Sequence, residues 1–192
     1  VHAAEIQDVK KSGKQQDFTR VSFIPDLEKL AKGDEKLQII PNDDYAIMCR
    51  RVFDVAGCSG GKLTVTLNGQ IVPVHSFEDY ARLYNDKSKK DESQARMLFQ
   101  KLNARWEIGV GCSKSGSFES MSFVNGMDTL RGGTHVNAVV QQVTKKIADK
   151  VGKENPELAE TVTQALVRRH LSIFVNSLIE NPTFDSQMKE YL

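Results

Sequence analysis

Runs in which apolar and polar residues alternate predict most of the strands of this chain. Residues 62–67 and 70–74 alternate on either side of Asn68-Gly69, and an Asn-Gly pair between such runs favours a tight type I′ hairpin. A turn over residues 113–116 is expected to fold one strand back onto the next in an antiparallel meander. The other strands are expected over residues 18–24, 106–112, 118–124 and 170–179.

One long helix follows from apolar residues at helical spacing. A cap at Thr134 and a stop at Gly152 are its expected ends. Pro156 at a first-turn position predicts a further helix that continues to Leu166. The apolar stripe of the long helix consists of Val136, Val139, Val140, Val143, Ile147 and Val151.

Two earlier helices have polar residues at their expected starts. Ser76 followed by Asp79 resembles a capping box with the shorter acid. Asn42 or Asp43 can cap the other helix. The residues expected to face inward are Phe77, Tyr80, Ala81 and Tyr84 in the first of these, and Tyr45, Met48, Val52 and Phe53 in the second.

The order of these elements predicts an α+β domain. Strand, two helices and strand over residues 118–179 form a βαβ-type crossover behind the meander, which predicts a mixed sheet with helices covering one face. Residues 1–17, 28–40 and 85–94 are polar or charged and are expected to be lead-in and loops.

Composition excludes some classes of protein. The net charge of the 192-residue chain is +1, so no general basic field indicates a nucleic-acid partner, and any DNA contact has to be local. Three cysteines without metal-like spacing favour reduced thiols in an intracellular compartment, buried as small hydrophobic residues.

Two segments could bind phosphate. Gly132-Gly133 stands directly before the long helix, whose N-terminus is electropositive. Its spacing fits neither a Walker A loop nor a dinucleotide fingerprint, so a tight turn docked by His135 is the favoured interpretation. Lys189 follows the last strand and could deliver a compact positive charge to a terminal phosphate. Residue types alone favour an ordinary surface lysine.

Two strings connect these segments to a known family. Residues 123–135 contain Phe-Val-Asn and then Gly-Gly-Thr-His, and residues 181–189 read Asn-Pro-Thr-Phe-Asp-Ser-Gln-Met-Lys. Both resemble the transducer domain of eukaryotic type IIA DNA topoisomerases. Residues 19–26 resemble the last strand of the preceding ATPase domain. The resemblance implies that residues 1–40 end a GHKL-type ATPase domain and that residues 41–192 are the transducer, with a ribosomal-protein-like fold and a left-handed crossover.

The resemblance also implies a function. The parent would be a nuclear, homodimeric enzyme that uses ATP and Mg²⁺ to pass one DNA duplex through another, with both cofactors held mainly outside this chain. Gln187, Met188 and Lys189 would form a loop that senses the γ-phosphate, and Lys189 would act in ATP turnover. The family usually has threonine in place of Met188, which puts contacts of that side chain in doubt. The chain would relay the nucleotide state from the ATPase domain to the DNA gate.

Other functions remain open at this point. The resemblance implies DNA contacts at Lys150 and Lys153, but acidic neighbours make a solvated face the favoured alternative. A stand-alone nucleic-acid-binding module on the same fold would need a dense basic face, and a small-molecule kinase would need a glycine-rich phosphate loop. The sequence indicates no metal site.

Overall fold

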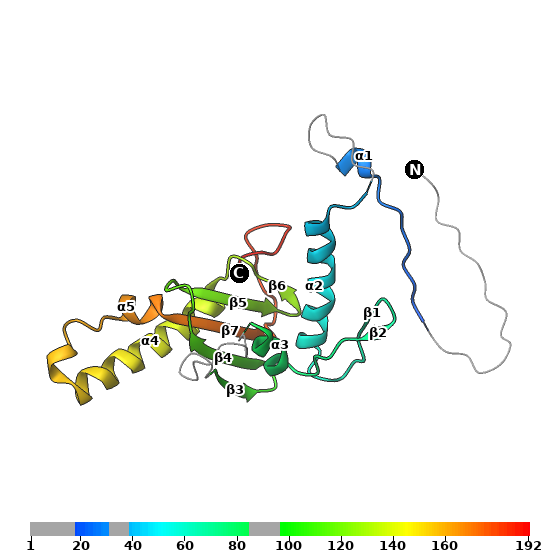
Figure 1. Ribbon diagram of the computed structural model, residues 1–192. Coiled ribbons are helices and arrows are strands. Elements are labelled where there is room, and N and C mark those ends of the chain that lie inside the picture. Colours follow the sequence, from blue (N-terminus) through cyan, green and yellow to red (C-terminus); the bar gives the residue numbers. More distant parts are fainter. Residues whose placement is uncertain (1–17, 31–38, 85–96) are drawn as a thin grey trace. The chain divides into compact units, whose positions relative to one another are not determined.

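The N-terminal part of the chain departs from the sequence prediction. The computed structural model describes residues 18–30, 39–84 and 97–192 (Figure 1), and the chain divides into two compact units, residues 1–42 and 43–192. In the first unit α1 spans Leu27–Leu30. The strand predicted over residues 18–24 is wrong, because no described residue pairs with this segment, and a strand needs a neighbour for its backbone groups. The expected lead-in and the loop 85–94 lie outside the described residues.

A five-stranded sheet forms the centre of the second unit, in the order β3-β4-β7-β5-β6. Strand β7 pairs in parallel with β5 and antiparallel with β4. The predicted direct return from β4 to β5 is therefore wrong: β7, the most deeply buried strand, lies between them. The strands span Leu98–Asn103 (β3), Trp106–Cys112 (β4), Glu119–Val124 (β5), Met127–Asp128 (β6) and Leu171–Ser177 (β7).

The crossover between β5 and β7 confirms the predicted βαβ unit, with changed helix ends. Helix α4 spans Thr134–Glu154 and passes the predicted stop at Gly152. A side chain at Gly152 would come within 3.2 Å of Ala159 Cβ, so the glycine allows close packing of the returning chain. The predicted helix from Pro156 is two shorter pieces, a 3₁₀ turn η1 (Pro156–Leu158) and α5 (Gln164–Arg169).

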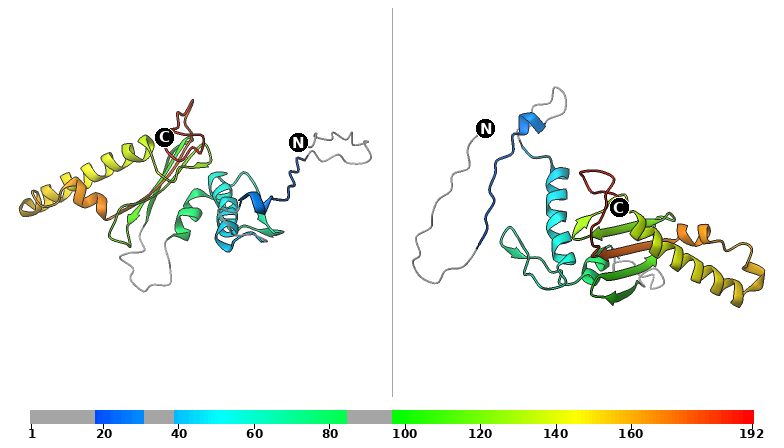
Figure 2. Two further views of the ribbon diagram at one scale, coloured as in Figure 1. Left: turned by 90° about the horizontal axis from the view of Figure 1, so that it is seen from above. Right: turned by 180° about the vertical axis from the view of Figure 1, so that it is seen from behind.

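The expectation that helices cover one face of the sheet is wrong, because helices cover both faces, each over its own core (Figure 2). Helices α4 and α5 pack on one face, where the predicted valine stripe meets Ile173 and Val175 of β7. Helices α2 (Asn42–Cys58) and α3 (Phe77–Leu83) pack on the other face. The buried residues of that second core are Ala56, Val72, Val74, Phe77, Tyr80, Ala81, Met97, Phe123 and Phe174.

The predicted turn chemistry of the second unit is confirmed. Asn68 and Gly69 take positive φ angles of 51° and 80° between β1 (Thr66–Leu67) and β2 (Gln70–Ile71), although these strands are shorter than expected. The Asp79 amide donates to Ser76 Oγ at 3.0 Å, and the His75 amide donates to the Asp79 carboxylate at 3.1 Å. The first bond is the predicted side-chain cap, whereas the carboxylate reaches back to the residue before the N-cap instead of to Ser76 itself, a variant of the capping box.

Helix α2 is buried along only part of its length. Val52 and Phe53 pack against the core as predicted. The inward positions predicted for Tyr45 and Met48 are wrong, since both side chains are 49% exposed. The core of this unit meets only the second half of the helix. No described helix is long and apolar enough to cross a membrane.

Candidate functional site

The chain forms a loop after β7 (Figure 1). The predicted sensor residues lie at its tip, because the Asp185 amide donates to the Tyr191 carbonyl at 3.2 Å on either side of them. The Lys189 amide donates to the Ser186 carbonyl at 3.1 Å, which places Gln187 and Met188 at the centre of a tight turn. Lys189 itself takes a φ of 58°. All three side chains are exposed, and Met188 is 70% exposed. No described carboxylate forms an ion pair with Lys189.

The returning end of this loop caps helix α4. The Thr134 amide donates to the Leu192 carbonyl at 3.0 Å, and the Arg131 amide donates to the Glu190 carbonyl at 3.0 Å. The predicted side-chain cap at Thr134 is therefore wrong. Gly133 is the N-cap residue, and a backbone carbonyl from the loop takes the place of a capping side chain.

Gly133 is required by this close approach. Its φ is 146°, and a Cβ there would lie 2.5 Å from the Leu192 carbonyl oxygen. The glycine pair therefore packs against the backbone of Leu192. This supports the favoured interpretation of a tight turn over that of a phosphate-binding loop.

His135 docks the turn from inside. Its side chain is 3% exposed, and its Nε2 lies 3.2 Å from Thr129 Oγ1. Thr129 Oγ1 in turn donates to the Ser122 carbonyl at 2.9 Å. Burial lowers the pKa of His135 to about 4, so the ring is neutral at pH 7. The predicted docking role is confirmed.

One arginine holds the side of the loop. Arg131 donates to the Asp185 carboxylate at 3.0 Å, and its guanidinium lies 5.9 Å from the centre of the Tyr191 ring. These contacts are largely exposed and add orientation more than stability.

A buried polar cluster that the sequence analysis missed joins α2 to α3 and β6. Asp54 is fully buried and accepts from Tyr80 Oη at 2.6 Å and from Arg51 at 2.8 Å. Arg50 donates to Asp128 of β6 at 2.6 Å. Burial raises the pKa of Asp128, and the neighbouring Arg50 opposes that rise. The sequence contained a signal for this cluster: Asp54 follows Arg51 by three residues in α2, and the next helix, α3, is rich in aromatic residues.

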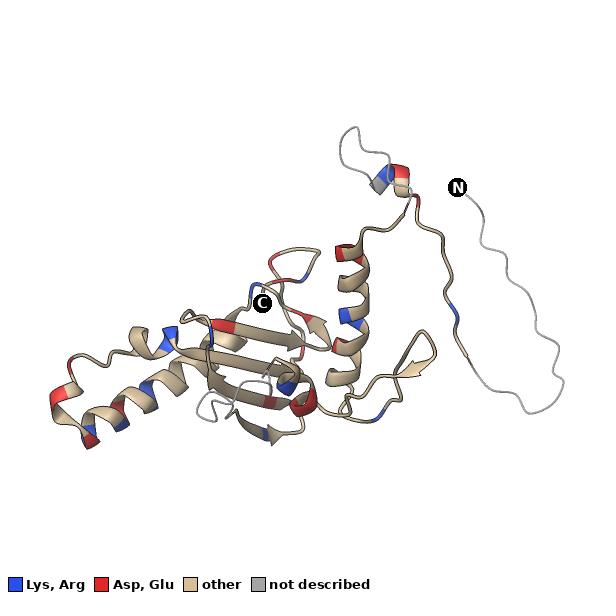
Figure 3. Cartoon of the chain, viewed as in Figure 1, with Lys and Arg blue, Asp and Glu red and all other residues tan. Residues whose placement is uncertain are grey.

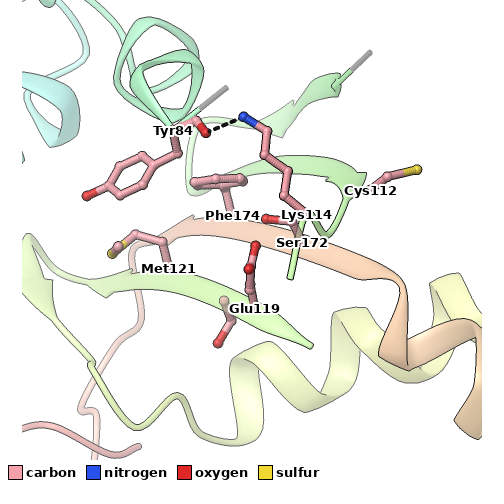
Figure 4. Close-up of a pocket in the computed structure, with 8 residues that line it drawn as sticks. Tyr84, Cys112, Lys114, Glu119, Met121, Ser172 and Phe174 are labelled. Carbon is pink, nitrogen blue, oxygen red and sulfur yellow. Dashed lines mark hydrogen bonds between the residues drawn. The ribbon is translucent and has the colours of Figure 1, made fainter. Parts of the chain in front are cut away.

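The cavity in Figure 4 is separate from the terminal loop. It measures about 370 Å³, and Lys114 Nζ donates across its rim to the Tyr84 carbonyl at 3.2 Å. Glu119 and Ser172 line it and pair at the beginnings of β5 and β7. The terminal loop begins at the opposite end of β7, after Ser177, and none of the predicted site residues lines the cavity.

Lys150 and Lys153 lie in the C-terminal half of α4. This half of the helix carries both basic and acidic residues (Figure 3). Lys150 is 74% exposed and lies 3.8 Å from Glu154. With a rise of about 1.5 Å per residue, Lys150 is roughly 24 Å along the helix from the end where the terminal loop docks. The structure therefore does not bring these lysines together with Lys189.

The cysteines are free thiols in different surroundings. Cys58 is half-buried, and burial raises its pKa to about 12. Cys112 was expected to face inward, but it is exposed at the end of β4. No group of three or more potential metal ligands occurs in the described parts of the chain.

Comparisons with known proteins identify the family. The family model described as DNA gyrase B matches residues 76–192, which include the Gly-Gly turn and the terminal loop. The chain belongs to this family. It is 42% identical over 186 residues to DNA topoisomerase 2 of Arabidopsis thaliana, an alignment that covers 96% of this chain and 12% of that protein.

Solved structures give the same result for the fold. The ATPase and transducer domains of DNA topoisomerase II from Balamuthia mandrillaris superpose with a TM-score of 0.69 at 46% identity, over 78% of this chain and 35% of that one. The ATPase region of Saccharomyces cerevisiae topoisomerase II superposes with a TM-score of 0.69 at 35% identity, over 81% of this chain and 37% of that one. The chain thus has the α+β fold of this region of topoisomerase II and spans about an eighth of its curated relative.

Proposed function

We propose that this chain relays the nucleotide state of an ATP-dependent type II DNA topoisomerase to its DNA gate. The observation that carries the proposal is the exposed Lys189 at the tip of a loop that is anchored at both ends. Membership of the DNA gyrase B family and similarity to topoisomerase II relatives support this choice.

The chemistry of the tip suits a terminal phosphate. An ammonium group is a compact cation with three donors, and the strongest partner for it is an anionic oxygen. Lys189 has no described counter-ion of its own, so binding a phosphate would not require it to break an ion pair. Gln187, in the same turn, can donate a second hydrogen bond from its amide. The rest of ATP and its Mg²⁺ would be held by the ATPase domain of the parent enzyme.

The relay would work through the anchors of the loop. Because the loop caps α4 and contacts the segment between β6 and α4, a displacement of Lys189 towards a phosphate would pull on the sheet and helices together. Rigid-body movement of packed elements is a known route for such transmission. In the parent enzyme, a nuclear homodimer, this movement would reach the DNA gate.

Lys150 and Lys153 are proposed as local contacts to the DNA duplex. Both are exposed in the second half of α4, and the partner of Lys150 within the described part of the chain is the exposed Glu154. A phosphate could replace this carboxylate at small cost, because exposed ion pairs contribute at most about 1 kcal/mol.

The test is ATP turnover of the full-length parent enzyme that carries Lys189→Ala. Removal of a preorganised donor from a developing charge typically costs about 10²-fold in kcat, so we expect a fall of that order with an unchanged melting temperature. Lys189→Arg keeps the charge and serves as the matched control, which should retain more activity. Turnover by Lys189→Ala at the wild-type rate would overturn the proposal.

A further inference from the structure

We propose that Asn125 and Gly133 are positioning residues that clamp the two ends of the Lys189 loop. This inference rests on the proposed function of Lys189 and adds residues that act through it. The clamp gives a physical reason for two features of the sequence that the proposed chemistry alone does not use, an asparagine after β5 and a glycine before α4.

Asn125 holds the outgoing end of the loop. Its Nδ2 donates to the Ile179 carbonyl at 2.9 Å, and its Oδ1 accepts from the Ile179 amide at 2.9 Å. The side-chain amide thus bonds as a peptide group would. It extends the β5–β7 pairing by one step past Val124 and Ser177, the last paired residues. The backbone of Asn125 takes a φ of 52°, a region that asparagine tolerates better than most residues.

Gly133 holds the returning end. The Leu192 amide donates to the Gly132 carbonyl at 3.3 Å, and the Leu192 carbonyl accepts from Thr134 at 3.0 Å. Between these two bonds the Leu192 backbone lies directly against Gly133, where any Cβ would overlap it. The clamp therefore depends on the absence of a side chain at this position.

Both anchors belong to one short stretch of chain, residues 125–133, and that stretch is itself fixed to the body of the domain. Arg50 pairs with Asp128 inside it, and His135 docks behind it. Residues 180–191 are all that lie between the two anchored residues, Ile179 and Leu192. Fixing both ends restricts the volume that the Lys189 ammonium can explore and so lowers the entropy lost when it meets a phosphate.

A clamp of this kind differs from a merely stabilising contact in one measurable respect. Its contribution to ATP turnover exists only when Lys189 is present. We therefore use a double-mutant cycle in the full-length enzyme, with kcat for ATP as the readout. Asn125→Gly removes both side-chain bonds and tolerates the positive φ. Asn125→Asp has the same shape and keeps only the acceptor.

With Lys189 intact, we expect Asn125→Gly to lower kcat by up to about 10²-fold, as for the misplacement of a catalytic group, and Asn125→Asp to lower it less. In the Lys189→Ala background neither change should lower kcat further. Gly133→Ala should behave as Asn125→Gly does. Thr163→Ala removes the α5 cap, which lies outside the clamp, and should leave kcat unchanged in both backgrounds.

The outcomes separate this inference from the function on which it rests. If Lys189→Ala leaves kcat unchanged, the proposed function fails and the clamp fails with it. If Lys189→Ala lowers kcat but the Asn125 variants have no effect, or an effect that multiplies with it, only the clamp is overturned. If Asn125→Gly does not fold, the isosteric Asn125→Asp variant decides the question by the same cycle.

Discussion

The hydroxyl of Tyr80 donates a 2.6 Å hydrogen bond to Oδ1 of Asp54, and this bond ties α3 to α2 inside the core. Asp54 is fully buried, and Arg51 pairs with its other oxygen. A buried carboxylate is costly unless its oxygens are satisfied. The position of α2 on the sheet therefore depends on this bond.

Replacing Tyr80 by Phe tests that dependence. Among the described residues, the variant leaves Asp54 Oδ1 only the distant Arg50 Nε at 3.9 Å, and loss of a hydrogen bond to a charged group costs about 1.5–3 kcal/mol. Urea unfolding should show a loss of roughly 2 kcal/mol. Tyr84→Phe, which removes only a 3.0 Å contact with the Tyr80 hydroxyl, is the control and should cost less than half as much.

Acidification should weaken the fold through His135. Its pKa is about 4 in the folded chain and about 6.5 when unfolded. Between these pH values only the unfolded chain takes up the proton. This contribution is therefore constant above pH 6.5, and stability falls as the pH drops from 6.5 towards 4, by roughly 2–3 kcal/mol. Unfolding of His135→Gln should lack this part of the pH dependence. Parallel curves for the two proteins would contradict the assignment.

Gly57 allows α2 to pack closely against α3. A Cβ at this position would lie 2.7 Å from Tyr80 Cβ. Alanine in place of glycine favours a helix by about 0.5–1 kcal/mol, but overpacking of a core costs about 1–3 kcal/mol. Gly57→Ala should therefore be destabilising by about 1 kcal/mol or more in denaturant unfolding. Gly111→Ala, whose Cβ would meet only Met97 Cβ at 3.9 Å, should be nearly neutral.

The proposed DNA contact can be measured by its salt dependence. Each phosphate neutralised by a protein cation contributes about 0.9 to the slope of log K against log salt. In the full-length enzyme, Lys150→Gln with Lys153→Gln should therefore make the slope shallower by about 2. Lys62→Gln with Lys101→Gln removes the same charge away from α4 and should leave the slope as it is. An unchanged slope for the α4 pair would rule the contact out.

Local signals in the sequence were reliable where neighbouring residues alone determine the structure. The Asn68-Gly69 turn and the Ser76 cap of α3 formed as predicted, because each is determined by residues close in the sequence. The apolar stripe of α4 was also right for all its predicted residues except Val151, which is not part of the core, since helical spacing decides which side chains share a face.

The errors arose where a distant segment decides the structure. Strand β3 was not predicted. It lies at the edge of the sheet, where even Leu98 and Leu102 are exposed, so its sequence does not alternate between buried apolar and exposed polar residues. The cap of α4 comes from Leu192, which no pattern near Thr134 could indicate. Of the candidate site, the family resemblance indicated Lys189, whose role stays a prediction. The sequence did not indicate the residues that anchor its loop, since Asn125 and Ile179 meet only after the chain has folded.

The place of β7 in the sheet has a consequence for biosynthesis. Its residues come after all other strands in the sequence, yet they supply the hydrogen-bonding partners of both β4 and β5. While residues 171–177 are still inside the ribosomal tunnel, β4 and β5 each have an unpaired edge. The two hydrophobic cores also lack the β7 side chains that belong to each of them. We therefore expect this domain to complete its sheet only after residues 171–177 have left the ribosome, and chaperones that shield unpaired strands to be needed most before that point.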